Sequence, residues 1–203
     1  MGGKRPIFNR EEGVNKKETI LTEAKRLSGR YGYLGFTLKQ LAQACQMTAP
    51  ALYYFYTSKA DLFKDCLLTE LELRHVSLSA CAERAQSLPE FAELLAIEAF
   101  EKCSASCFRT GQAMQEIIHL PEEIQTELRA AWERTLIRPV EQLLERVMPG
   151  NAAATNHMLA TFFINMATFA GYYEEQYGRQ AITAMLVAAA TGMQTNRDAI
   201  AKA

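Results

Sequence analysis

Residues 37–59 read TLKQLAQACQMTAPALYYFYTSK, and this stretch decides how the N-terminal part of the chain folds. Thr37 followed by Gln40 has the spacing of a capping box, in which each residue satisfies a backbone N–H group of the other. The pattern therefore predicts a helix of about two turns over Leu38–Cys45.

A second short helix is predicted immediately after the first. Gln46 and Met47 form a tight turn in this prediction, and Thr48 caps the helix that follows. Pro50 falls in the first turn of that helix, where its missing N–H is harmless. Ala residues on both helices permit a close crossing of the two axes. The stretch therefore predicts a helix-turn-helix.

The outward face of the second predicted helix carries short or flat side chains. They are Thr48, Ala49, Pro50, Tyr53 and Tyr54. Such groups suit the floor and walls of a DNA major groove. An ordinary helical hairpin with surface tyrosines would show the same residues, so the spacing alone leaves that alternative open.

Charge is unevenly distributed along the chain. Ten basic and five acidic side chains lie between Met1 and Leu62, which gives this part a net charge of +5. The whole chain of 203 residues has a net charge of −1, so the remainder carries −6. A basic N-terminal third indicates that one end of the molecule meets a polyanion, although a chance distribution of solvated charges is the alternative.

The cysteines and the apolar stretches predict a soluble, cytoplasmic protein. Five cysteines without a CxxC pair, in apolar helical sequence, are typical of free thiols in a reducing compartment. The first residues, MGGKRPIFNREEG, lack the apolar core of a signal peptide. The most apolar stretch, Leu159–Tyr173, is too short and too polar to span a membrane. We therefore expect no membrane partner, no cofactor and no metal.

Helix signals recur along the rest of the chain, whereas strand signals are nearly absent. The predicted boundaries are a start at Asn15 with Glu18, an end at Gly32, starts at Ser58, Ser87 and Leu120–Glu123, a kink at Pro139, a break at Pro149–Asn151, and two late helices over roughly Ala152–Tyr177 and Gln180–Met193. His75 is assigned to a solvated helix face. The fold class is all-α: three short helices, a long one, and a bundle of about five.

The run from Ile20 to Leu62 resembles the N-terminal DNA-binding domain of the tetracycline-repressor (TetR) family of transcription regulators. The matching features follow without a gap: Tyr31-Gly32-Tyr33, Phe36-Thr37, Leu41-Ala42, Met47-Thr48, Leu52-Tyr53-Tyr54-Phe55, and Ser58-Lys59 with Leu62. One position departs, because the family usually has Gly in the turn where this chain has Gln46. Gln can hold a positive φ there at a cost of about 1 kcal/mol, and a slightly different turn geometry is the alternative. The remainder of the chain matches the family only in length and helical layout.

The resemblance implies a helix-turn-helix domain over residues 1–58 and an effector-binding and dimerisation domain over residues 59–203. By that resemblance, phosphates would be held by Thr37, Thr48, Tyr54 and Lys59. The groove would be faced by Lys39, Ala49, Pro50 and Tyr53, with apolar readout at the two small residues. The implied partners are double-stranded DNA with an inverted-repeat operator and a second copy of the chain. The implied function is repression, relieved by an unknown small-molecule effector.

Two late segments, Leu159–Tyr173 and Ala181–Met193, are apolar on more than one face. Each should therefore bury a second face against another helix or another chain. A two-fold dimer through a four-helix bundle would supply that surface, and two central helices in the core of a monomer are the alternative. The candidate interface residues are Phe162, Met166, Phe169, Tyr173, Ile182, Met185, Leu186, Ala189 and Met193.

Residues 91–132 supply the apolar side chains from which an effector pocket would be built. The candidates are Phe100, Cys103, Phe108, Met114, Ile117, His119 and Trp132, each of which would serve equally well as plain core. Cys103 and Cys107 are one helical turn apart, which suits a thiol sensor or a soft metal. No third ligand is in view, so buried structural thiols are the simpler interpretation.

Other function classes fit the sequence less well. The three histidines are scattered, and HExxH, GxSxG and a phosphate-binding glycine loop are missing, which argues against an enzyme. A helical protein-interaction module would explain the apolar late helices, but neither the charge bias nor the pattern of residues 37–59. A transcriptional activator of the same fold is the alternative to a repressor.

Overall fold

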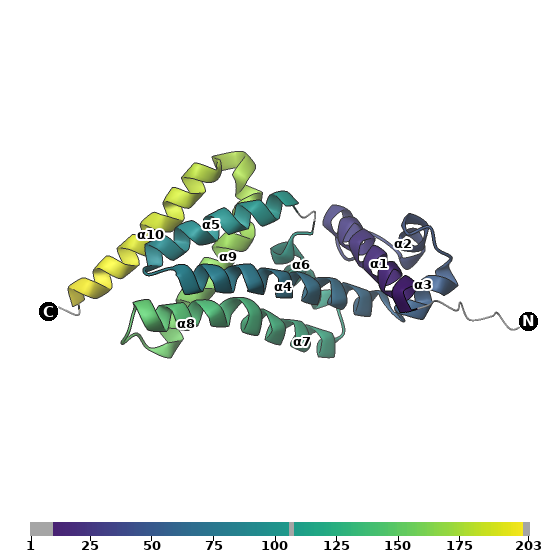
Figure 1. The fold of residues 1–203 in the computed structure, drawn as a ribbon, viewed down its shortest axis with the longest axis horizontal. Coiled ribbons are helices and arrows are strands. Elements are labelled where there is room, and N and C mark those ends of the chain that lie inside the picture. Colours follow the sequence, from purple (N-terminus) through teal and green to yellow (C-terminus); the bar gives the residue numbers. More distant parts are fainter. Residues whose placement is uncertain (1–9, 106–107, 201–203) are drawn as a thin grey trace, which may run out of the picture. The chain divides into compact units, whose positions relative to one another are not determined.

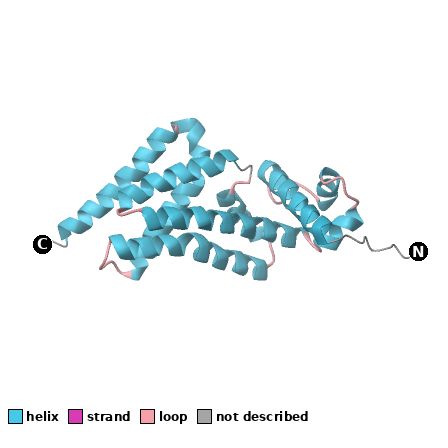
Figure 2. Ribbon diagram, viewed as in Figure 1, coloured by secondary structure: helices cyan, strands magenta, loops and turns pink. Residues whose placement is uncertain are grey.

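The computed structural model describes residues 10–105 and 108–200, and within these ranges every regular element is a helix (Figures 1 and 2). The elements are α1 (Arg10–Tyr31), α2 (Leu38–Ala44), α3 (Ala49–Phe55), α4 (Lys59–Arg84), α5 (Leu88–Ala105), α6 (Thr110–Glu116), a 3₁₀ turn (Ile117–His119), α7 (Glu122–Trp132), a π-helical turn (Glu133–Ile137), α8 (Arg138–Val147), α9 (Ala153–Tyr177) and α10 (Arg179–Ile200). The predicted all-α class is confirmed.

The chain forms two compact units. The first contains the residues up to Thr69 together with Gln112–Leu128, and the second contains Glu70–Gly111 and the residues from Arg129 onward. Helices α4, α6 and α7 each contribute residues to both units. The sequence did not indicate that a segment so far along the chain would join the N-terminal helices. The expected boundary after residue 58 remains a prediction.

Helix α1 begins at Arg10, so the predicted start at Asn15 is wrong. Asn15 lies inside the helix, and its carbonyl accepts a hydrogen bond from the Thr19 hydroxyl at 2.9 Å. Glutamates close to a helix N-terminus are favourable there, which is consistent with the earlier start. The predicted end is confirmed, because Gly32 has a φ of +72° and its N–H donates to the Ser28 carbonyl.

The predicted starts of α4 and α5 are confirmed by side-chain caps. The Ser58 hydroxyl accepts the Asp61 N–H at 3.0 Å, and the Ser87 hydroxyl accepts the Glu90 N–H at 3.3 Å. These bonds satisfy donors that lack an intrahelical partner, so both helices begin where the sequence placed them.

Pro139 interrupts the predicted long helix as expected, through a π-helical turn directly before it. The Arg138 N–H reaches back to the Glu133 carbonyl, five residues away. Pro139 has no N–H to offer the Thr135 carbonyl, which instead lies 2.9 Å from Nδ1 of His75. His75 is therefore half-buried against this turn, and its assignment to a solvated face is wrong.

The core of the second unit lies where α5 packs against α9 and α10, and where α9 packs against α8 (Figure 1). Phe91 and Phe163 meet edge to face at its centre, with ring centroids 6.3 Å apart. The break at residues 149–151 and a long α9 are confirmed, while α10 extends past the predicted end at Met193 to Ile200. Among the described helices, none combines the length and the apolarity needed to cross a membrane.

Helices α2 and α3 form the predicted helix-turn-helix. Thr37 and Gln40 make both bonds of the capping box, and Thr48 caps α3 by accepting the Ala51 N–H. Gln46 is the only non-glycine residue with positive φ in the described part of the chain, at +53°. The left-handed conformation expected at this turn is therefore present, and an L side chain occupies it at an energetic cost.

We predict that Gln46→Gly stabilises the protein. Glycine removes the left-handed strain but adds freedom to the unfolded chain, so the net gain is about 0.5–1 kcal/mol. The matched control is Gln43→Gly, an exposed position of α2, where glycine should instead cost about 1 kcal/mol. Urea unfolding of both variants measures the difference, and a loss of stability in Gln46→Gly would contradict the strain at this turn.

Candidate nucleic-acid interface

Apolar contacts fix α3 against the rest of the first unit. Leu41 and Ala42 of α2 and Leu52 of α3 are almost completely buried, as the helix-turn-helix pattern predicts. Leu52 is the only fully buried side chain of α3 within its seven residues. The remaining face of α3 is therefore available to a partner.

The predicted groove-facing side chains of α3 lie on that remaining face. Tyr53 and Tyr54 are 51% and 59% exposed. Thr48 and Pro50 are exposed, and Ala49 is half-buried. Aromatic side chains are enriched in interfaces relative to the rest of a protein surface, so this face has the composition of a contact surface.

Thr37 and Lys39, at the start of α2, are also exposed. The Thr37 hydroxyl accepts the Gln40 N–H and donates to the Gln40 carboxamide, so it takes part in the cap. The Thr48 hydroxyl is likewise used by α3. Both threonines lie at helix N-termini, where backbone N–H groups without intrahelical partners can meet a phosphate.

Lys59 differs from the other predicted DNA contacts. Its ammonium donates to the Phe36 carbonyl and lies 4.8 Å and 4.1 Å from the ring centroids of Tyr33 and Phe36. Burial lowers the pKa of Lys59, and the nearby Glu116 carboxylate opposes that shift. The Lys59 ammonium is thus occupied by contacts within the first unit. A phosphate at this position would therefore meet the N-terminus of α4 and not an unoccupied lysine side chain.

The predicted pocket residues do not share one environment. Phe100 and Phe108 of the second unit are buried, as is Ile117 of the first. Met114 and Trp132 are half-buried, and His119 is exposed. The side chain of Cys103, and the whole of Cys107, lie outside the described residues.

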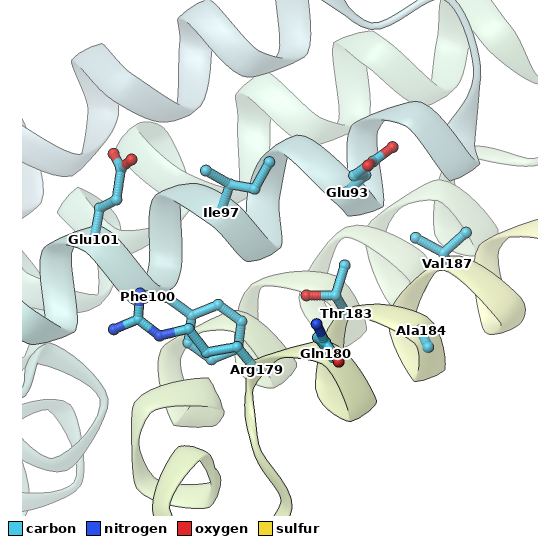
Figure 3. Close-up of a pocket in the computed structure, with 9 residues that line it drawn as sticks. All are labelled: Glu93, Ile97, Phe100, Glu101, Arg179, Gln180, Thr183, Ala184 and Val187. Atoms are coloured by element: carbon cyan, nitrogen blue, oxygen red, sulfur yellow. The ribbon is translucent and has the colours of Figure 1, made fainter.

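Of these candidates, Phe100 lines an open groove of about 490 Å³ between α5 and α10. Figure 3 shows the lining side chains, which are Glu93, Ile97, Phe100, Glu101, Arg179, Gln180, Thr183, Ala184 and Val187. The Arg179 guanidinium lies 5.4 Å from the centroid of the Phe100 ring. Sequence reasoning missed the α10 side of this groove because it treated α10 only as an interface helix.

The predicted dimer residues divide into two groups. Phe162, Tyr173 and Met185 are exposed by 39%, 39% and 50%, while Met166, Phe169, Ala189 and Met193 are half-buried. Ile182 and Leu186 are buried within the chain itself. These two residues therefore belong to the core of the second unit, because α10 turns that face towards α5 and α9.

The described cysteines have the properties of structural thiols. Cys66 is buried, and burial together with Glu23 raises the pKa of Cys45 to about 11. Burial also raises the pKa of Cys81. Since the thiolate is the reactive form, none of these three is suited to sensing oxidants. Among the described residues, no group of three or more candidate ligands is arranged to hold a metal ion.

Residues 20–66 match the family model described as bacterial regulatory proteins, tetR family. No curated protein matches the chain. Among solved structures, AibR in complex with isovaleryl coenzyme A and operator DNA is 16% identical with a TM-score of 0.69, covering 85% of this chain and 96% of that one.

Two further solved structures show the same fold. A TetR-family transcriptional regulator from Bordetella parapertussis is 20% identical with a TM-score of 0.67, covering 85% of this chain and 92% of that one. A TetR transcriptional regulator from Legionella pneumophila is also 20% identical, with a TM-score of 0.65, covering 93% and 99%. The helix-turn-helix of α2 and α3 thus lies within residues 20–66, the segment that matches the tetR family model, and the chain shares its fold with TetR-family regulators of known structure.

Proposed function

We propose that the protein is a repressor that binds an inverted-repeat operator as a two-fold dimer and releases it when a small molecule binds. The observation that carries this proposal is the exposed face of α3, where Tyr53 and Tyr54 are displayed on a helix anchored from behind by Leu52. A helix held in this way can enter a major groove without rearranging the core. The excess of basic over acidic residues before Leu62 supports a polyanionic partner.

The dimer is supported by apolar side chains that α9 and α10 leave in water. On α9, Met158, Phe162, Tyr173 and Tyr177 are exposed, and Phe169 is half-exposed along the same stripe. On α10, the exposed positions are Ala181, Met185, Ala188 and Gly192. Both stripes have the three-to-four-residue spacing of one helix face, and a second copy would bury them in a four-helix bundle. The buried Ile182 and Leu186 are not part of this proposed interface.

An effector is proposed because AibR, which shares the fold, was solved with both isovaleryl coenzyme A and operator DNA. The candidates within this chain are the predicted pocket residues, of which Phe100 lines the groove between α5 and α10. An effector that releases DNA must bind the DNA-free form more tightly, and DNA must weaken effector binding by the same factor.

The first prediction from this proposal concerns the operator. Selection of bound duplexes from a random pool should return an inverted repeat with half-sites about one helical turn apart. With three to four phosphates per subunit, the slope of log affinity against log salt should be about −5 to −7. Recovery of asymmetric or single-stranded sequences alone would contradict the two-fold dimer.

The same selection with two variants separates readout from general binding. Tyr53→Ala should broaden the selected sequences while leaving the salt slope unchanged, because Tyr53 faces the bases in this proposal. Tyr31→Ala is the control, since Tyr31 is a similarly exposed tyrosine at the end of α1. If both variants select the same sequences as the original protein, Tyr53 has no role in readout.

A pair of neighbouring substitutions tests the interface. Met185→Glu places a carboxylate on the exposed stripe and should give a folded monomer that has lost operator binding. Leu186→Glu, one residue along, buries an unpaired carboxylate at a cost of several kcal/mol and should unfold the second unit. Sedimentation and circular dichroism distinguish these outcomes, and a Met185→Glu variant that remains dimeric would place the interface elsewhere.

Reciprocity between effector and operator provides the test of regulation. We expect at least one compound to raise the melting temperature in a panel of acyl-coenzyme A thioesters and small apolar or cationic molecules. Titration of that compound should show weaker binding when the selected operator is present. Equal affinity with and without operator would show that the compound is not an inducer.

A further inference from the structure

One carboxylate joins the end of α1 to the end of α6. Glu116, the last residue of α6, accepts the Tyr33 N–H at 2.9 Å although 83 residues separate them. Its second oxygen lies against Gly32, where any side chain would collide with it. Gly32 thus provides both the positive φ of this turn and the space that the carboxylate occupies.

Lys59 completes this cluster. Glu116 favours the charged form of Lys59, against the burial that lowers its pKa. The ammonium in turn is fixed over the rings of Tyr33 and Phe36. We refer to Glu116 with its contacts to Gly32, Tyr33 and Lys59 as the Glu116 tie.

The path of the chain gives this tie a mechanical role. Residues 112–128 belong to the first unit, but the chain enters this segment through α6 and leaves it through α7, and both helices also have residues in the second unit. A connection through α4 alone would leave the first unit free to rotate about that helix. With three passages of the chain between the units, at α4, α6 and α7, such a rotation would strain α6 and α7.

The two ends of α6 are both held. At its start, the buried Thr110 hydroxyl accepts a hydrogen bond from Nε of Arg74 at 2.8 Å. Gly111 approaches Thr168 of α9 so closely that a Cβ would lie 3.1 Å from the Thr168 side chain. At its other end, Glu116 accepts the Tyr33 N–H. Contacts with neighbouring segments therefore exist at both ends of this seven-residue helix.

Lys64 and Glu127 make another polar contact between the same parts of the first unit, at 3.2 Å. Half of the Glu127 side chain is exposed, and ion pairs this exposed contribute little to stability. The Glu116 tie is the stronger restraint because it bonds to backbone in a partly buried site.

We propose that Glu116 is a positioning residue for operator recognition, which fixes the separation at which the two α3 helices of a dimer meet successive major grooves. The inference rests on the proposed two-fold binding. Changing the spacer of an inverted repeat by one base pair moves the half-sites by about 3.4 Å and rotates them by about 36°. A rigidly held pair of recognition helices should lose affinity when the spacer changes, whereas a loosely held pair should bind both spacers with similar affinity.

The test starts from an inverted repeat that the original protein selects, and lengthens or shortens its spacer by one or two base pairs. The affinities of the original protein and of each variant are then measured for every spacer length. The original protein should lose about tenfold or more at altered spacers, and Glu116→Ala and Glu116→Asp should lose less than about threefold. Aspartate keeps the charge but is one methylene too short to reach Tyr33. Glu116→Gln should retain the preference, because its amide oxygen can still accept the Tyr33 N–H.

Glu127→Ala is the matched control and should behave like the original protein. A general loss of stability would lower the affinity for every duplex alike and leave the spacing preference unchanged. If Glu116→Ala does not fold, Glu116→Asp decides alone. If Glu116→Gln also loses the preference, the charge facing Lys59 is part of the tie.

The proposal is overturned if the folded alanine and aspartate variants keep the original spacing preference, or if Glu127→Ala loses it to the same extent. Failure of the proposed function is distinguishable, because the original protein would then select no two-fold site at all.

Discussion

The candidate interface depends on burying a few apolar side chains beneath two helices that are too short to persist alone. Helices α2 and α3 have seven residues each, and isolated helices of that length are unstable in water. The hydroxyls of Thr37 and Thr48 each accept one N–H of the first turn, and Leu41 and Leu52 supply the burial that holds the two helices. Because Leu52 is the only fully buried side chain of α3, the helix is held while Pro50, Tyr53 and Tyr54 stay exposed.

In the second unit, the N–H that Pro139 lacks changes the hydrogen bonds of the residues around it. Pro139 cannot donate a hydrogen bond to the Thr135 carbonyl, and the preceding turn is π-helical. The imidazole of His75, on α4, bonds to that carbonyl instead. Arg146 similarly donates to the carbonyls of Ala82 and Ala85 at the end of α4. These bonds join helices distant in sequence through backbone groups that a continuous helix would have used internally.

Burial within the chain also separates residues that the sequence had grouped together. Met185 and Leu186 are adjacent apolar residues, yet one is half-exposed and the other is in the core. The apolar residues of α10 cover more than one face, which indicates that two surfaces of the helix are buried. The pattern does not indicate which residues belong to the core of the chain and which to a second surface. The packing of α10 against α5 makes that assignment.

The sequence by itself determined the local features: the all-α class, the capping box of Thr37 and Gln40, the helix-turn-helix and the interruption at Pro139. These depend on residues within a few positions of each other, where backbone geometry and side-chain type suffice. Only the tertiary structure decided the internal role of Lys59, the burial of Ile182 and Leu186, and the contact between Glu116 and Tyr33. Each of these depends on which distant segment packs alongside. Glu116 carries no recognisable motif, because its partner is a backbone N–H that every residue except proline possesses.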